Sequence, residues 1–183
     1  MTLRAVLATE GPASQAVLRS LCLRLGVRAL VLRADGKDRL LKDFHRLFAT
    51  SREHSESYIV VPDLHPNNDC RAEVERWRRE IDSRFPLAKL SLAIWETESW
   101  LLADAAGLSR DLGIPVVGFD PESVIGSPPS DVLHDLFRKS KGYRRGAAFD
   151  KETDGARLIS IIDLQVARER SPSLGRLLRL LGH

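Results

Sequence analysis

Acidic side chains follow each of the four apolar stretches in the N-terminal part of the chain. These acids are Glu10, Asp35, Asp63 and the pair Glu96 and Glu98. Carboxylates that converge repel one another, and a hard divalent cation such as Mg²⁺ or Mn²⁺ relieves that repulsion. A cation held by carboxylates, water and substrate phosphate activates water for phosphodiester cleavage. The acids therefore suggest metal-dependent phosphodiester chemistry.

Three acids have a simpler explanation as helix caps or turn residues. Asp69, at the end of PDLHPNNDC, suits the N-cap of the following helix as well as it suits a metal site. Asp35 precedes Gly36 and is typical of a turn. Glu98 can serve as a first-turn residue that offsets the helix dipole.

Glu10 and Asp63 are harder to explain in this way. Ser14 is the better candidate for the cap of the first helix, because Glu10 is followed by Gly-Pro. Asp63 stands several residues before its helix. We therefore expect Glu10 and Asp63 to lie at the centre of any site.

The elements that must position these acids alternate between strand and helix. Apolar, strand-like stretches span residues 3–8, 27–32, 58–61 and 87–95, with a short fifth candidate at 116–119. Helical periodicity spans residues 14–25, 38–51, 69–81 and 98–108. This alternation predicts an α/β fold with a doubly wound, mainly parallel sheet of four to five strands and right-handed crossovers. The carboxyl ends of parallel strands meet at one edge, where sites form in such sheets.

The last third of the chain has a different pattern. It contains a loop at 120–129, a helix around 132–137, the basic loop RKSKGYRRG at 138–146, and helices at 156–168 and 173–181. We interpret residues 1–119 as an α/β domain and residues 120–183 as a helical extension packed on the same core. A length of 183 residues suits such a single structural domain.

Composition narrows the class of protein. Hydrophobic residues make up 43% of the chain and charged residues 29%, which is typical of globular proteins. No apolar run is long enough to span a bilayer, and the first residues do not match a signal peptide, so we expect no membrane partner. Cys22 and Cys70 both fall in helical patterns, which favours reduced thiols in a cytoplasmic protein. A net charge of +3 permits nucleic-acid binding without requiring it.

Other common chemistries lack their motifs. The chain contains no GxxxxGK[ST] or GxGxxG nucleotide-binding loop, no GxSxG nucleophile elbow and no Cys/His set with zinc spacing.

Four stretches together resemble a known fold. They are EGP at 10–12, PDLHPNNDC at 62–70, AIWETESWLLAD at 93–104 and the C-terminal segment at 149–181. A glutamate after the first strand and an acidic motif after the third resemble the Toprim fold of topoisomerases, bacterial-type primases and nucleases of the overcoming-lysogenization-defect type. The chain most resembles a family of small Toprim-like proteins that are often encoded beside an SMC-like AAA ATPase in phage-defence cassettes.

The resemblance implies roles for individual residues. Glu10 corresponds to the Toprim glutamate, a metal ligand or general acid/base, and Asp63 to the first aspartate of an Asp-x-Asp metal pair. Glu96 and Glu98 are additional acids at the same edge. The residues expected to contact nucleic-acid phosphate are Arg144, Arg145 and Lys151.

The chain departs from the family pattern at two places. His65 occupies the second aspartate position, and Ala13-Ser14 replaces a common Thr-Glu pair. Histidine suits Mn²⁺ better than Mg²⁺. Asp69 replaces the missing carboxylate only if the intervening loop folds back.

The leading hypothesis is a nuclease that depends on Mg²⁺ or Mn²⁺ and acts as the effector of an antiviral ATPase–nuclease pair. The alternative is a non-catalytic Toprim-like subunit that binds an ATPase partner or nucleic acid. A topoisomerase- or primase-like nucleotidyl transferase ranks last, because no second domain for strand passage or template handling is evident.

Overall fold

A four-stranded parallel sheet forms the centre of the computed structural model, which describes residues 4–51, 55–64, 69–118, 120–122 and 127–183. Its strands are β1 (Ala5–Thr9), β2 (Ala29–Arg33), β3 (Tyr58–Val61) and β5 (Ala88–Leu90). They lie in the order β2-β1-β3-β5, and every neighbouring pair is parallel. The predicted α/β class and mainly parallel sheet are confirmed.

A short two-stranded ladder continues from the carboxyl ends of β3 and β5. β4 (Asp63–Leu64) follows β3 and pairs in parallel with β6 (Ala93–Ile94), which follows β5. Pro62 separates β3 from β4 and has no backbone N–H to donate. The single strand predicted at 87–95 is therefore wrong, because it is divided into β5 and β6.

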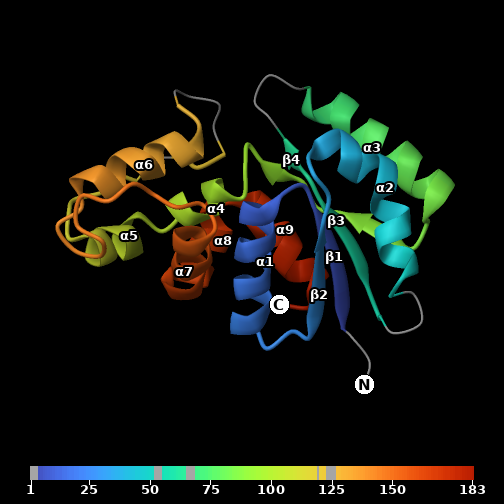
Figure 1. Cartoon of the computed structure of the whole chain (residues 1–183), viewed down its shortest axis with the longest axis horizontal. Helices are drawn as coiled ribbons and strands as arrows, with labels where there is room; N and C mark the ends of the chain where they lie inside the picture. Colours follow the sequence, from blue (N-terminus) through green and yellow to red (C-terminus); the bar gives the residue numbers. More distant parts are fainter. Residues whose placement is uncertain (1–3, 52–54, 65–68, 119, 123–126) are drawn as a thin grey trace.

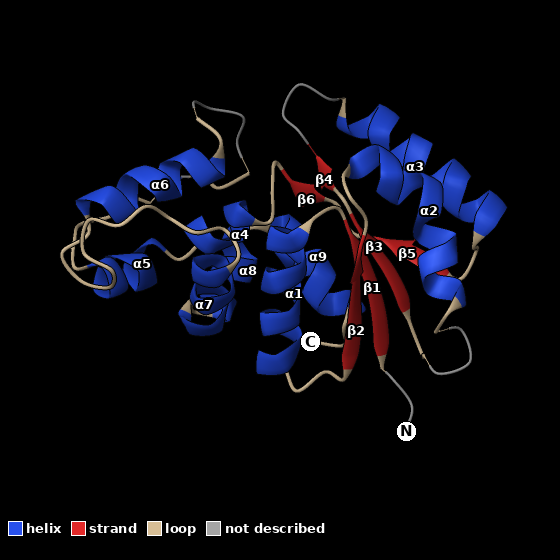
Figure 2. Ribbon diagram, in the orientation of Figure 1, coloured by secondary structure: helices blue, strands red, loops and turns tan. Residues whose placement is uncertain are grey.

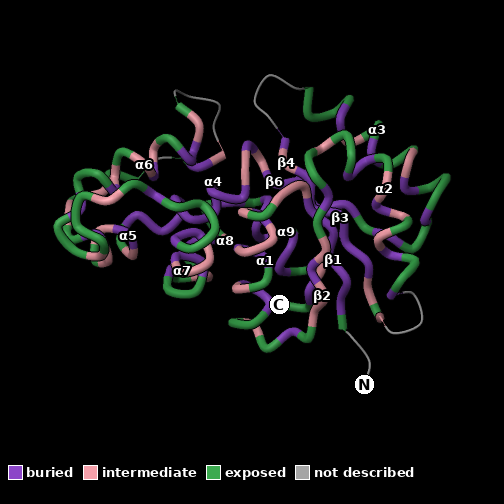
Figure 3. Tube along the Cα trace, in the orientation of Figure 1, coloured by how far each residue is buried: buried purple, intermediate pink, exposed green. Residues whose placement is uncertain are grey.

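Helices cover both faces of the sheet (Figures 1 and 2). α1 (Pro12–Arg24) and α9 (Pro172–Leu180) lie on one face, and α2 (Lys37–Ala49) and α3 (Cys70–Arg84) lie on the other. Side chains of β1 alternate between the two cores, with Leu7 in one and Val6 and Ala8 in the other. Figure 3 shows β1 and β3 buried along their length, which explains why these strands are apolar without interruption.

The remaining described helices are more numerous than the sequence pattern predicts. They are α4 (Glu98–Leu102), α5 (Ala105–Leu112), α6 (Pro129–Lys139), α7 (Thr153–Ile161) and α8 (Leu164–Arg170). The prediction of one helix at 98–108 is wrong because Asp104 ends it and caps α5, accepting a hydrogen bond from the Gly107 N–H. The prediction of one helix at 156–168 is wrong because Asp163 likewise caps α8.

The fifth strand predicted at 116–119 is not found in its described part. Residues 116–118 are irregular, and residue 119 lies outside the described residues. The side chain of Val117 is 83% exposed. The Val116 N–H donates to the Ser109 hydroxyl rather than to a strand. This apolar run therefore has no place in the sheet.

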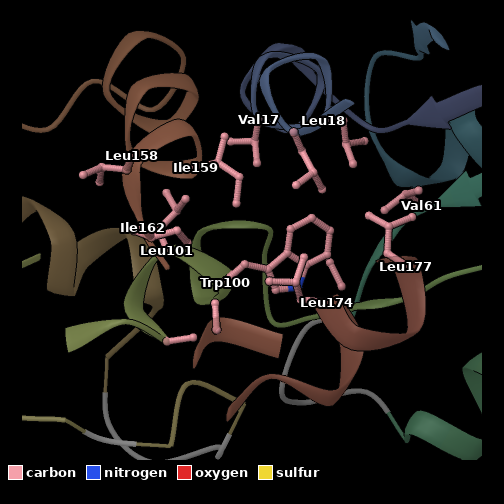
Figure 4. Packing of buried hydrophobic residues seen from close by; sticks show 14 of the residues in the cluster. Val17, Leu18, Val61, Trp100, Leu101, Leu158, Ile159, Ile162, Leu174 and Leu177 are labelled. Atoms are coloured by element: carbon pink, nitrogen blue, oxygen red, sulfur yellow. The ribbon is translucent and has the colours of Figure 1, made fainter. Parts of the chain in front are cut away.

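Trp100 lies at the centre of the larger core (Figure 4). Its ring is fully buried, together with Leu18 of α1, Ile159 of α7 and Leu174 of α9. Its indole N–H donates to the Ser173 hydroxyl at 2.8 Å. One core thus joins the parallel sheet to the C-terminal helices. No helix in the described part of the chain has the length and apolar character needed to cross a membrane.

Candidate functional site

Acidic residues from distant parts of the chain line one pocket beyond the carboxyl ends of the strands. The pocket has a volume of about 390 Å³, and we call it the carboxylate pocket. Its charged lining residues are Glu10, Asp35, Asp63, Glu96, Glu98 and Lys151. Glu10 follows β1, Asp63 opens β4 and Glu98 opens α4. The four acids expected to be catalytic, Glu10, Asp63, Glu96 and Glu98, are thus brought together.

Asp63 is the most constrained acid of this pocket. Its backbone N–H donates to Glu10 Oε1 at 2.8 Å, so the two residues are fixed relative to each other. Its Oδ1 atom is buried and has no hydrogen-bond partner. Burial raises the pKa of the Asp63 carboxyl well above its usual range, and the charges of Glu10, Glu98 and Glu96 raise it further. A cation or a proton at Oδ1 would relieve this unfavourable environment.

Lys151 supplies positive charge to the same pocket. Its Nζ lies 3.4 Å from Glu96 Oε2 and 3.5 Å from Glu98 Oε1. Burial raises the pKa of Glu98, and Lys151 partly offsets that effect. Burial alone would lower the pKa of Lys151, but attraction to Glu98 and Glu96 outweighs it and raises that pKa. Lys151, expected to contact phosphate, therefore pairs with two carboxylates in this structure.

A buried aspartate holds the segment that carries Lys151. Asp154 is fully buried, and its Oδ2 accepts hydrogen bonds from Arg144 Nη1 at 2.9 Å and from the Asp150 N–H at 2.8 Å. Arg144, expected to bind nucleic acid, is thus turned toward a carboxylate of its own chain. Arg145 is exposed.

The segment bearing Glu96 and Glu98 follows an unusual backbone conformation. Trp95 has φ of +64°, in the left-handed region that a bulky residue rarely adopts. Its ring is buried and its backbone N–H donates to the Leu64 carbonyl, so packing and the β4–β6 ladder hold this conformation. The turn then directs both glutamates toward the pocket.

A buried hydroxyl pair links α1 to α4 behind the acids. Thr97 Oγ1 lies 3.3 Å from Ser14 Oγ and 3.2 Å from Glu98 Oε2. Ser14 is therefore inside the fold, and the prediction that it caps the first helix is wrong. α1 begins at Pro12 with Gly11 as its N-cap, because proline suits the first helical position.

The helices α1 and α2 begin at the carboxylate pocket. The N-caps Gly11 of α1 and Gly36 of α2 both line it, and neither helix has a side-chain cap. Gly36 has φ of +97°, which favours glycine. Uncapped helix N-termini present N–H groups and positive potential to anions. The pocket thus combines acids suited to a cation with helix ends suited to a phosphate.

Of the two remaining expected metal ligands, only Asp69 is among the described residues. Asp69 does not line the pocket; it caps α3 and accepts hydrogen bonds from the N–H groups of Arg71 and Ala72. His65 lies outside the described residues.

The chemistry of the acids still suits a hard cation. No three His, Cys, Asp or Glu side chains among the described residues are arranged to hold a metal ion together. Mg²⁺, however, is usually bound by one or two carboxylates, with water and substrate phosphate completing its shell. The buried, unpartnered oxygen of Asp63 beside Glu10 fits a site of that kind.

Several residues of the site were not recognised from the sequence. Thr97 and Ser14 support Glu98, and Asp154 holds the segment before Lys151. The order Glu-Thr-Glu was a weak signal for Thr97. The signal for Asp154 was its place in the C-terminal segment 149–181, where a spaced aspartate follows Lys151 before a helix, but its partners depend on the folded loop.

Comparison with known proteins identifies a family for nearly the whole chain. Residues 9–182 match the family described as "Domain of unknown function (DUF4276)". Searches of curated proteins and of solved structures gave no significant match. Because the family match includes the acids of the pocket and the C-terminal helices, the chain belongs to the DUF4276 family.

Proposed function

We propose that this chain is a divalent-metal-dependent nuclease with a Toprim-like fold, and that the carboxylate pocket is its active site. One observation carries the proposal: Glu10, Asp63, Glu96 and Glu98 line one pocket at the carboxyl edge of a parallel sheet, where two helix N-termini also lie. Acids and anion-binding N–H groups in one pocket match the needs of a metal-bound phosphodiester.

Each residue has a distinct task in the proposed reaction. Asp63 and Glu10 would hold Mg²⁺ or Mn²⁺, and the Asp63 N–H keeps the Glu10 carboxylate in place. The metal, when bound, would neutralise phosphate charge and lower the pKa of a water molecule. Glu96 and Glu98 accept or position protons near the water, and Lys151 limits their repulsion.

The substrate and partner belong to the same proposal. The N-termini of α1 and α2 would receive the phosphate, and Arg145, which is exposed, would contact the nucleic-acid backbone. An SMC-like AAA ATPase would act with the nuclease in antiviral defence; this part rests on the resemblance described above.

Substitution of the two central acids tests the nuclease proposal. Glu10→Gln and Asp63→Asn keep side-chain size, and each is expected to reduce Mn²⁺-dependent cleavage of DNA or RNA by about a hundredfold or more. Glu56→Gln and Asp82→Asn are matched controls, because both residues are exposed and neither lines the carboxylate pocket. The assignment fails if Glu10→Gln and Asp63→Asn cleave as fast as these controls.

A non-catalytic role is the second candidate, and the position of Lys151 favours it. Its ammonium already balances Glu96 and Glu98, as a metal would in an enzyme. In that case the pocket would bind nucleic acid or the ATPase partner without cleavage. Calorimetric titration with Mn²⁺ separates the two: the nuclease proposal predicts binding at up to millimolar Mn²⁺ that Asp63→Asn removes, and the non-catalytic role predicts none.

A further inference from the structure

A second pocket lies along the open edge of the sheet. It has a volume of about 340 Å³ and shares no lining residue with the carboxylate pocket. β5 is the last strand of the main sheet, and β6 extends it. Among the described residues, no strand pairs with the outer side of β5 or β6. We call this second pocket the edge pocket.

The backbone at this edge has no strand partner on its outer side among the described residues. Alternate N–H groups of the segment donate inward to β3, Pro62 and β4; the donors are Ser91, Ala93 and Trp95. Strand alternation therefore points the N–H groups of Leu90 and Leu92 outward. An open edge of this kind accepts an extended chain through backbone hydrogen bonds.

The walls of the edge pocket are apolar and come from the helices on both faces. Leu90, Leu92 and Ile94 line it from the strand segment, and Val74 lines it from α3. α9 lies on the other side and contacts β6. An added strand would therefore place apolar side chains against these residues.

Two arginines give the edge pocket its charge preference. Arg176 and Arg179 line it from α9, are exposed, and form no ion pair with any described residue. A spacing of three residues places them on the same side of the helix. Guanidinium groups bind carboxylates through paired hydrogen bonds, so they favour an acidic ligand.

Glu122 also lines this pocket, but its carboxylate is occupied. It accepts hydrogen bonds from the Ser171 hydroxyl and from the Ser173 N–H at the start of α9. Its charge is thus directed to the helix N-terminus, and the two arginines have no carboxylate partner from it.

We propose that the edge pocket binds an extended, acidic segment of a partner protein as an added strand beside β5 and β6. The ligand would bond to the outward backbone groups of Leu90 and Leu92, place apolar side chains against Leu92 and Ile94, and direct acidic side chains to Arg176 and Arg179. The proposal does not depend on catalysis, because the carboxylate pocket takes no part in it.

Fluorescence anisotropy with a labelled peptide of alternating valine and glutamate tests this proposal on the full chain. We expect saturable binding that weakens about tenfold or more in the double variant Arg176→Ala/Arg179→Ala. The matched double variant Arg28→Ala/Arg33→Ala changes exposed arginines at the opposite edge and should bind as the unmodified chain does. Two control peptides are tested on the unmodified chain: one has lysine in place of glutamate, and the other has alternate backbone nitrogens methylated. Each should bind no more tightly than the acidic peptide binds to Arg176→Ala/Arg179→Ala.

Three results would overturn the proposal. The first is no binding of the acidic peptide. The second is equal binding to the two double variants or to the methylated peptide. The third is a dimer in sedimentation equilibrium that Arg176→Ala/Arg179→Ala dissociates, because the edge pocket would then be an interface between copies of this chain. None of these results bears on nuclease activity, so the two proposals fail separately.

Discussion

The carboxylate of Asp63 lies in an electrostatically unfavourable environment. Its Oδ1 is buried without a hydrogen-bond partner; burial raises the pKa of the carboxyl, and three other carboxylates raise it further. Groups in such environments reduce the stability of the fold and are typical of functional sites. This environment follows from the position of Asp63 at the start of β4, where its backbone N–H donates to the Glu10 carboxylate.

The pH dependence of stability follows from that raised pKa. Above its raised pKa, the folded chain must carry the Asp63 charge in an unfavourable place, whereas the unfolded chain carries it in water. Between the unfolded and folded pKa values the folded state binds more protons, so stability falls as pH rises through this window. Below the unfolded pKa, both states are protonated and the destabilising effect is absent.

Asp63→Asn is therefore expected to stabilise the metal-free protein at neutral pH. Removing a buried, unpaired charge is worth on the order of 1–3 kcal/mol, which corresponds to a rise in Tm of a few degrees, roughly 2–4 °C per kcal/mol. The gain should shrink as pH is lowered into the acidic range. Thermal unfolding followed by circular dichroism at several pH values, with EDTA present, measures this. An Asn variant that is less stable at neutral pH than the unmodified chain contradicts the electrostatic account.

At the scale of elements, the connection between α6 and α7 supplies the positively charged side chain of Lys151 to the carboxylate pocket. Asp154, at the start of α7, binds Arg144 and the Asp150 N–H, and Lys151 follows directly. Because buried Asp154 holds this connection in place, the Lys151 ammonium is kept close to the carboxylates of Glu96 and Glu98. Asp154 is thus a positioning residue for Lys151.

Asp154→Ala should loosen this connection while the sheet stays folded. Hydrogen exchange is expected to speed up at the Asp150 amide, because that N–H loses its acceptor, while amides of β1 and β3 stay protected. Losing the hydrogen bonds of buried Asp154 should lower stability by about 1–3 kcal/mol, because the Arg144 side chain is 40% exposed and its remaining charge can be solvated. Glu152→Ala is the matched control, because its side chain is exposed in the same segment. Unchanged exchange at Asp150 in Asp154→Ala contradicts the positioning role.

Element boundaries show where sequence reasoning succeeds and where it does not. The apolar run at 58–61 predicts β3 with the correct ends, because both faces of that strand are buried. Asp104 and Asp163 each interrupt an apolar helical pattern and cap the next helix. A single aspartate within such a pattern is too weak a signal to predict a helix boundary. The partners of Asp154 and Lys151 were not predictable, since they depend on how a loop folds.

At the scale of the whole molecule, the sequence predicts that the acids converge. It does not predict which residues hold them in place. Parallel strands end at one edge, so residues after them, such as Glu10 and Asp63, meet there whatever the loops do. Asp69 lies beyond this rule, because it stands five residues after the end of β4 at Leu64. Its capping role, one of the two alternatives weighed from the sequence, is the one found.

The larger core makes the C-terminal helices part of the sheet's stability. Leu158, Ile159, Leu174 and Leu177 are all fully buried with α1. Each contributes about 1.5–3 kcal/mol by burial, and together they approach the whole net stability of a domain, about 5–15 kcal/mol.

A chain that ends before α7 is therefore expected not to fold. It should show no cooperative thermal transition, whereas the full chain should unfold with coincident transitions in circular dichroism and tryptophan fluorescence. Two separate transitions in the full chain, or a cooperative transition in the shortened one, would contradict a single core.

Anomalous diffraction from crystals soaked in Mn²⁺ tests the proposed metal site most directly. The account predicts a manganese peak within about 2.6 Å of an Asp63 carboxylate oxygen, with Glu10 in contact directly or through water. The same soak of Asp63→Asn crystals should give no peak there. Absence of a peak at Asp63, at a Mn²⁺ concentration that supports cleavage, would contradict the proposal that this pocket is the metal-dependent active site.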